Sequence, residues 1–318
     1  FITGAGHGST IADTYGNWWH ASTMRISVNY DFERRVGLFP AGFDKDGVLY
    51  CNQNFSDYPH RIPAGKFDAA SQQPEWMLLS YKKPVTASST AENSSPELAV
   101  NEDCRSWWSA AGTEPGEWLC VDLGKDSDVR AIQVNMADEK LVVDFPADSY
   151  GDDRQTRHIE TRPQISHYTV ETSVNGADWT TRETVARECS NGYYEYADGI
   201  RARYVRVTGG ELPYGQALRI SGLRVFGNGE GPKPAQAEAA GARVDALDAK
   251  ITWKHIENAQ GCNVRYGVAP DKLYLSWLVY DADEVTLSTL TAGQEYYVCV
   301  DSFNENGIMP GKTFKLEG

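Results

Sequence analysis

The chain has 318 residues, of which 41% are hydrophobic and 23% charged, a composition typical of a globular protein with two or three domains. Its 44 acidic residues outnumber its 30 basic ones, and the formal net charge is -14. Because a phosphate backbone requires a basic surface, this balance argues against a nucleic-acid partner. No apolar run approaches the roughly 18 residues of a membrane-spanning helix, so we expect no membrane partner either.

Turn signals recur along the chain, whereas helical periodicity is nearly absent. Hairpin signals occur at residues 13–19, 44–47, 173–179 and 304–307, each between β-rich runs. The pattern predicts an all-β fold.

Two linker-like stretches divide the chain. One is polar and flanked by prolines, at residues 59–74, and the other is rich in Gly, Pro and Ala, at residues 227–241. We therefore expect three domains, at residues 1–66, 70–228 and 232–318.

The cysteines are too few and too scattered for a disulfide scaffold, and none forms a C-x-x-C or Cys/His pattern typical of zinc. We expect free core thiols, with Cys262 and Cys299 as the pair to test for a bridge. The six are Cys51, Cys104, Cys120, Cys189, Cys262 and Cys299.

The first segment carries three motifs in order. They are GAGHGS at residues 4–9, DTYGNW at residues 13–18 and the run RRVGLFPAGFDKDG at residues 34–47. Together they resemble the end of the catalytic domain of glycoside hydrolase family 43, which folds as a five-bladed β-propeller. The resemblance implies that residues 1–66 are the last blade, and that the preceding blades are its partners.

Two residues of this segment have a site role by the resemblance. His7 would lie on the inner strand near the propeller axis and hold a water or metal, or tune the nearby acid. Arg35 would contact substrate, because its planar fork suits sugar hydroxyls or a carboxylate. Alternatively, His7 is a local hydrogen-bonding residue of a Gly-rich turn, and Arg35 is ordinary strand surface.

The family inverts the anomeric centre with a carboxylate base and a carboxylic acid, and a third carboxylate orients the acid. In the family all three come from earlier blades. The acidic residues of this segment sit in turns and hairpin ends, so we nominate no catalytic acid or base here. They are Asp13, Asp31, Glu33, Asp44, Asp46 and Asp57.

A single blade buries its faces only against its neighbours. We therefore expect the apolar residues of residues 1–66 either to pack on the next domain or to stay exposed. They include Ile11, Trp18, Trp19, Val36, Leu38 and Phe39.

The middle segment resembles a discoidin (factor 5/8 type C) domain, the jelly-roll β-sandwich shared with family 32 carbohydrate-binding modules. An insertion at residues 138–163 interrupts the pattern. The resemblance rests on five stretches in the family's order, at residues 99–108, 117–124, 167–179, 201–208 and 218–227.

In that family one loop often binds calcium through oxygen ligands. Asn101, Asp103 and Ser106 stand at the matching place and predict a calcium site, although Gly222 stands where the family commonly has an acidic ligand. Alternatively, Asn101 and Asp103 form an Asx turn that closes the loop.

Sugar-binding modules stack pyranose rings on exposed aromatic faces. Tyr193, Tyr194 and Tyr214 lie in or beside predicted loops and are the candidates, with edge-strand packing as the alternative. Trp107, Trp118 and Trp179 match core positions of the family instead.

The last segment alternates apolar and polar residues, and its LTAGQEY stretch at residues 290–296 resembles the tyrosine corner of fibronectin type III domains. Trp253 and Tyr266 fall where that family packs its core. The resemblance implies a spacer sandwich without chemistry.

These resemblances together imply the C-terminal portion of an extracellular or periplasmic family 43-like hydrolase, of the α-L-arabinofuranosidase or β-xylosidase type. It would act on plant polysaccharide and carry an accessory carbohydrate-binding module. The alternatives are a non-catalytic glycan-binding or adhesion protein, and a structural tail that holds a catalytic domain.

Overall fold

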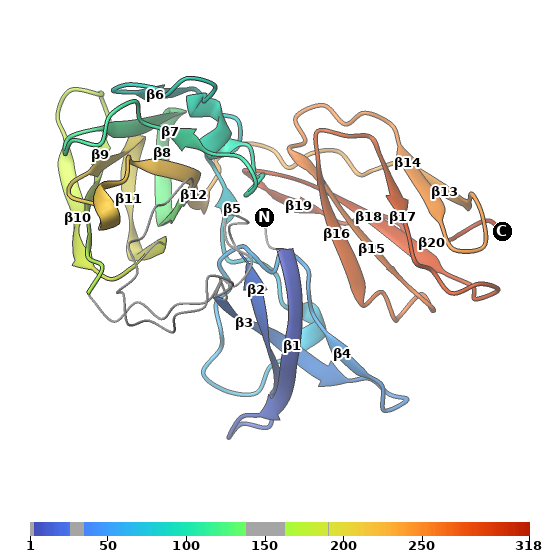
Figure 1. The fold of residues 1–318 in the computed structure, drawn as a ribbon. Coiled ribbons are helices and arrows are strands. Elements are labelled where there is room, and N and C mark those ends of the chain that lie inside the picture. The colour runs from blue at the N-terminus through green and yellow to red at the C-terminus, as the bar shows by residue number, and fades with distance from the viewer. Residues whose placement is uncertain (1–2, 26–34, 138–162, 190) are drawn as a thin grey trace, which may run out of the picture. The chain divides into compact units, whose positions relative to one another are not determined.

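The computed structural model describes residues 3–25, 35–137, 163–189 and 191–318. The described chain is built from antiparallel strands and three short 3-10 helices, which confirms the all-β prediction (Figure 1). None of the helices in this part of the chain is long and apolar enough to cross a bilayer.

The chain divides into two compact units. Among the described residues, unit 1 contains residues 80–225 and unit 2 contains residues 3–25, 35–79 and 226–318. Unit 2 thus combines the first and last predicted segments, and the three-domain division stays a prediction.

Unit 1 is built on an antiparallel sheet in the order β10-β9-β11-β8-β12, with β6 paired to β8 and β7 to β12. The two longest strands, β8 and β11, pair along their length with register breaks that bend them, as in a jelly-roll β-sandwich. Its elements are β6 (Val85–Ala87), η2 (Pro96–Val100), β7 (Trp108–Ser109), β8 (Trp118–Met136), β9 (Ser166–Ser173), β10 (Thr180–Arg187), β11 (Asn191–Gly209), η3 (Pro213–Gly215) and β12 (Arg219–Asn228).

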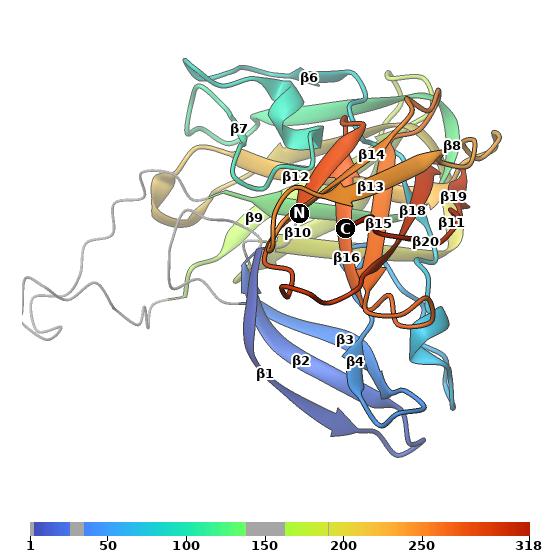
Figure 2. The ribbon, with the colours of Figure 1, turned by 90° about the vertical axis from the view of Figure 1, so that its right-hand side faces the viewer.

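Unit 2 begins with a four-stranded sheet in the order β1-β2-β3-β4 (Figure 2). Strand β3 alternates as far as Ala41: Val36 and Leu38 are exposed, and Phe39 and Ala41 are buried. Its elements are β1 (Thr3–Ala12), β2 (Trp18–Arg25), β3 (Arg35–Phe43), β4 (Leu49–Cys51), η1 (Ala69–Ser71) and β5 (Met77–Leu78). Strand β5 pairs with Phe226 and Gly227, the last residues of β12, which belong to unit 2.

The rest of unit 2 is a sandwich of two sheets, β13-β14-β17 and β16-β15-β18-β19, with β20 paired to β18. Trp253 is buried in its core and Tyr266 packs against that core, as expected. The Thr291 N–H donates to the Tyr296 hydroxyl (3.2 Å), which is the predicted corner contact. The strands are β13 (Ala239–Arg243), β14 (Ala249–Trp253), β15 (Gly261–Gly267), β16 (Leu275–Tyr280), β17 (Glu284–Leu287), β18 (Tyr297–Asn304), β19 (Gly307–Met309) and β20 (Phe314–Lys315).

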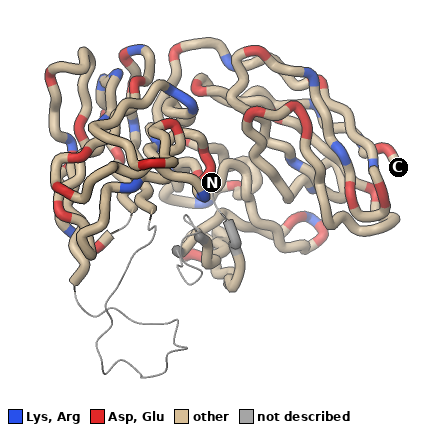
Figure 3. The backbone as a smooth tube through the Cα atoms, turned by 45° about the horizontal axis from the view of Figure 1, so that its top comes forward, with Lys and Arg blue, Asp and Glu red and all other residues tan. Residues whose placement is uncertain are grey.

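All six cysteines are free thiols, Cys262 and Cys299 included. Acidic and basic residues are interspersed along the described backbone of both units (Figure 3). The net negative charge is therefore spread over the chain rather than gathered in one block.

A buried ion pair crosses the core of unit 1. The Arg224 guanidinium, in β12, donates to both carboxylate oxygens of Glu102 (3.0 and 2.9 Å) and to the side-chain oxygen of Gln133 (2.9 Å). The side chains of Arg224 and Glu102 are only 1% and 3% exposed. A desolvated charge is tolerated only with such complete pairing.

Removing one partner of this pair should therefore be costly. We expect Arg224→Met to lower the free energy of unfolding by about 3–5 kcal/mol, because it leaves the Glu102 carboxylate buried and uncompensated. Chemical denaturation measures the loss. Adding Glu102→Leu should recover most of it, whereas Arg201→Ala, at a half-exposed arginine, should cost less than about 1 kcal/mol. A loss of that small size for Arg224→Met would contradict the prediction.

Candidate functional site

Four strands of unit 1 meet near the point where β8 ends and β12 begins. Arg219 starts β12 and pairs with Ser109 of β7, and its carbonyl accepts from the Ala137 N–H (3.1 Å). Asn135 pairs with Asn191 of β11, and its carbonyl accepts from the Ser221 hydroxyl (3.3 Å). The strand pairing thus brings Asn135 and Arg219 together from distant parts of the sequence.

Both side chains carry buried donors. Within the described part of the chain, Nε and Nη1 of Arg219 and Nδ2 of Asn135 have no hydrogen-bond partner. A buried donor without an acceptor costs about 1–3 kcal/mol, and more when it is charged. An acceptor oxygen of an ordered water or of a ligand would satisfy these donors. Asn135 is fully buried, whereas Arg219 is partly exposed and is the member of the two that a ligand can reach. We call Asn135 and Arg219 the donor pair.

The three tyrosines expected to contact sugar have different environments. Tyr214 lies in η3, five residues before Arg219, with a left-handed φ of 59° and 36% exposure. Tyr193, in β11, is 44% exposed. Tyr194 is buried, its hydroxyl is 2.5 Å from that of Tyr168, and burial raises its pKa. Tyr193 and Tyr214 therefore retain ring surface for a ligand, and Tyr194 does not.

The tryptophans expected in the core are only partly enclosed. Trp107, Trp118 and Trp179 are each partly exposed, and the Arg206 guanidinium covers the Trp179 ring at 3.9 Å from its centroid. The fully buried tryptophan is Trp108, whose indole N–H donates to the Ser89 carbonyl (3.2 Å). The buried position thus lies one residue later than expected.

The loop predicted to bind calcium is closed by its own hydrogen bonds. Asn101 Oδ1 accepts from the Asp103 N–H (2.9 Å), which is the Asx turn of the alternative interpretation. Asn101 Nδ2 donates to Ser106 Oγ (2.8 Å), which in turn donates to the Asp103 carbonyl (3.1 Å). The Arg105 side chain donates to Asp103 Oδ1 (2.9 Å) and lowers the pKa of that carboxyl.

The oxygen atoms of this loop do not fit a cation. The oxygens that would hold calcium already accept hydrogen bonds, and a guanidinium lies beside the only carboxylate among Asn101, Asp103 and Ser106. Glu102, between them in sequence, is engaged by Arg224, two residues beyond Gly222. The loop is thus tied to β12 by an ion pair. No cluster of three or more His, Cys, Asp or Glu suited to a metal occurs among the residues described.

His7 and Arg35 lie at the same end of the unit 2 sheet, on β1 and β3. His7 is exposed with a left-handed φ of 50° and lies within the register break of β1 between Gly6 and Ser9, and Arg35 pairs with Met24 of β2. A Cβ at Gly8 would meet the Ala21 carbonyl at 2.4 Å, so only Gly fits after His7. A substrate or axis role for His7 and Arg35 stays a prediction.

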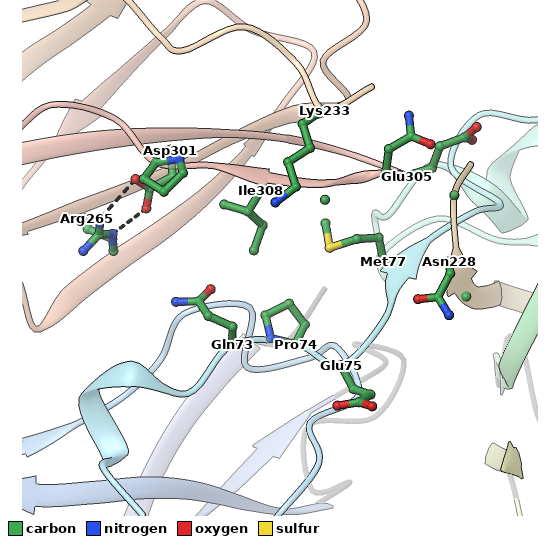
Figure 4. A pocket seen from close by; sticks show the side chains of 15 residues that line it. Gln73, Pro74, Glu75, Met77, Asn228, Lys233, Arg265, Asp301, Glu305 and Ile308 are labelled. Atoms are coloured by element: carbon green, nitrogen blue, oxygen red, sulfur yellow. Dashed lines mark hydrogen bonds and ion pairs between the residues drawn. The ribbon is translucent and has the colours of Figure 1, made fainter. Parts of the chain in front are cut away.

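A cavity of about 460 Å³ lies within unit 2 (Figure 4). Several charged residues that line it already form ion pairs. Arg265 donates to Asp301 (3.0 Å), and Glu75 pairs with Arg61 (3.1 Å). Met77 and Ile308 add apolar surface. This lining does not single out one class of ligand, and the donor pair of unit 1 is the stronger candidate.

Comparison with known proteins identifies the domain that carries this site. No curated protein matches the chain. Among solved structures, it is similar to chitosan-binding module 1 of a chitosanase/glucanase from Paenibacillus sp. IK-5 (19% identity, 48% of this chain and 99% of that one, TM-score 0.37). It is also similar to a fucose-binding module of Streptococcus pneumoniae (20% identity, 51% of this chain and 99% of that one, TM-score 0.34). A third similar structure is a glycoside hydrolase (18% identity, 70% of this chain and 46% of that one, TM-score 0.36).

The family model that matches is that of the NedA-like, galactose-binding domain of F5/8 type C, over residues 98–207. This stretch contains Glu102, Gln133, Asn135 and most of the β8–β11 sheet. Its match agrees with the jelly-roll arrangement of unit 1. Residues 98–207 thus match a discoidin-like family model, and the strand arrangement of unit 1 is that of a discoidin-like domain.

The closed loop makes a clear prediction for calcium. A bound ion would stabilise the fold by about 2.7 kcal/mol at a hundredfold excess over its Kd. Because hydrogen bonds already occupy the loop oxygens, we expect neither calcium nor a chelator to move the melting temperature. Arg105→Ala, which removes the guanidinium from Asp103, is the matched variant. A calcium-dependent rise in the unsubstituted protein would show that the loop rearranges to bind the ion.

Proposed function

We propose that the discoidin-like domain binds a glycan at the donor pair. The observation that carries the proposal is the set of buried, unpartnered donors of Arg219 and Asn135, in a domain whose family model is galactose-binding. Sugar hydroxyls and ring oxygens are acceptors that such donors can use, and a charged donor makes the stronger bond.

An aromatic surface beside the donors would complete the site. Tyr214 is partly exposed on the connection that leads into β12, and its ring offers a face for the C–H side of a pyranose. Of the three candidate tyrosines, Tyr193 on β11 is the other one whose side chain is exposed. The ligand class we propose is a neutral oligosaccharide or polysaccharide.

The finer proposal is that this domain belongs to an extracellular or periplasmic glycoside hydrolase of the family 43 type, active on arabinose- or xylose-containing plant polysaccharide. Its support is the motif series of residues 4–47 and the shape of the four-stranded sheet. Ile11, Val36 and Leu38 are 66%, 82% and 54% exposed, an apolar face suited to further blades of a propeller.

A glycan-binding or adhesion protein without catalytic activity is the alternative. This alternative uses the same donor pair, but residues 1–66 would then not belong to a catalytic propeller. Reading the coding sequence upstream of residue 1 separates the two, because the hydrolase requires further blades with three carboxylates.

Glycan binding is tested by calorimetry with galactose, arabino-oligosaccharides and xylo-oligosaccharides. We expect Arg219→Met to weaken binding about tenfold or more, since it removes charged donors. Tyr214→Ala should weaken it through the lost ring contact. Tyr194→Phe, which alters only a buried hydroxyl pair, is the matched control and should bind normally. Undiminished affinity in Arg219→Met, or no binding to any of these sugars, would reject the proposal.

A further inference from the structure

One carboxylate of unit 2 has two roles. Asp44 follows β3 directly, and its Oδ1 accepts from the N–H groups of Asp46 and Val48 (both 2.9 Å), closing the β3–β4 turn. Its Oδ2 accepts from the Tyr274 hydroxyl (2.9 Å) and pairs with Lys272 Nζ (2.8 Å). Lys272 and Tyr274 belong to the connection between β15 and β16 of the sandwich.

This contact is shielded from solvent. Lys272 and Asp44 side chains are 14% and 8% exposed, and Lys272 also pairs with Asp46 (2.6 Å). The neighbouring Lys45–Asp271 pair has side chains that are 70% and 55% exposed. Exposed pairs contribute little because water and salt screen them, so Asp44–Lys272 couples the two elements more strongly than Lys45–Asp271 does.

Aromatic contacts extend the same interface. The Tyr50 ring of β4 stacks on Tyr274, with centroids 4.7 Å apart and planes at 12°. Phe55, only 1% exposed, packs edge-on against Phe303 of β18 at 5.0 Å. The hydroxyl of Tyr58 lies 2.8 Å from that of Tyr280. Such buried aromatic pairs are the contacts that anchor interfaces.

The four-stranded sheet needs such a partner. Its β1–β3 face leaves Ile11, Val36 and Leu38 exposed, so it has few apolar residues with which to form a core of its own. Small isolated sheets are marginal in water unless they pack against another element. The sheet's β4 side and the residues that follow it make that packing.

We propose that the C-terminal sandwich is an intramolecular brace for the four-stranded sheet, joined to it through Asp44, Lys272 and the aromatic contacts. The sequence predicted a spacer for this sandwich. A spacer would leave the sheet's stability unchanged when its surface is altered, whereas a brace couples the two. The inference does not depend on glycan binding or on hydrolase activity.

Amide exchange of the full chain tests the brace. We expect Lys272→Met, a substitution in the sandwich, to lower protection of the β3 and β4 amides about tenfold or more and to leave β8 and β11 of unit 1 unchanged. Lys250→Met is the matched control, because that lysine pairs with Glu284 within the sandwich and is 46% exposed. It should leave β3 and β4 protected.

A double-mutant cycle guards against a general loosening of the sandwich. If the brace exists, Lys272→Met should have a smaller effect on β3 and β4 in an Asp44→Asn background, because only the Lys272–Asp46 pair is then left to break. Equal effects in both backgrounds would overturn the proposal, as would unchanged protection in Lys272→Met. Asp13→Asn, at the other aspartate-capped turn of this sheet, removes contacts to that turn and to Trp19 of β2, and it should leave the coupling between Asp44 and Lys272 unchanged.

The brace should also depend on pH in a defined direction. The pKa of Asp44 lies well below 3.8, chiefly because Lys272 donates to its carboxylate. Hydrogen bonds from Val48, Tyr274 and Asp46 lower the pKa further, and together these contacts outweigh the effect of burial. A lowered folded-state pKa gives stabilisation that is present above the ordinary carboxyl pKa and lost as the pH falls below it. Burial, followed by Asp44, raises the pKa of Tyr274 to about 12, so the tyrosine contact persists through neutral pH and is lost in strong alkali.

Asp46 and Lys45 from the same turn, Tyr50 from β4 and Asp271 from the facing loop are the other titratable groups around Asp44. We expect the protection factors of β3 and β4 to fall faster than those of β8 as the pH drops below 3.8. Asp44→Asn should remove this excess acid sensitivity. An equal acid loss in the Asp44→Asn protein would assign it to the other carboxylates.

Discussion

The pairing of Arg224 with Glu102 is the constraint on which the discoidin-like domain depends. It joins the middle of β12 to the loop after η2, and the bond to Gln133 adds β8 to the same network. Because both charges are almost fully buried, the three elements must hold one arrangement for the pair to survive. That arrangement fixes the course of β12, and therefore the position of Arg219 at its start.

The same pair explains how a loop that resembles a calcium site holds its shape. Glu102 adopts a left-handed φ of 63°, which turns its carboxylate toward Arg224 while Asn101 and Asp103 close the loop. A guanidinium with a fixed fork binds a carboxylate at two points, as a metal would, but it needs no further oxygen ligands. In this chain Arg224, two residues beyond Gly222 in β12, therefore holds the loop through Glu102.

Local chemistry made much of this fold predictable from the sequence. The turns at Asp13 and Asp44, the all-β class and the Tyr296 corner each depend on residues close together in the chain. The burial of Tyr194 beside the exposed Tyr193 also follows from a period of two, since adjacent residues of a strand point to opposite faces. The donor pair could not be predicted, because Asn135 and Arg219 are 84 positions apart and meet only through strand pairing. The brace escaped prediction for the same reason, since Asp44 and Lys272 come from opposite ends of the chain.

The acidity of the chain bears on the kind of glycan that we propose as its ligand. Its net charge of -14 repels polyanions at long range, but the Debye length is only about 8 Å at physiological salt, so the repulsion acts mainly on the approach of the ligand. At contact the N–H groups of Arg219 donate to a neutral hydroxyl or ring oxygen, and no anion has to be drawn into an acidic field. A neutral polysaccharide approaches the chain without repulsion and also accepts hydrogen bonds from Arg219. An acidic polysaccharide accepts these hydrogen bonds but is repelled as it approaches.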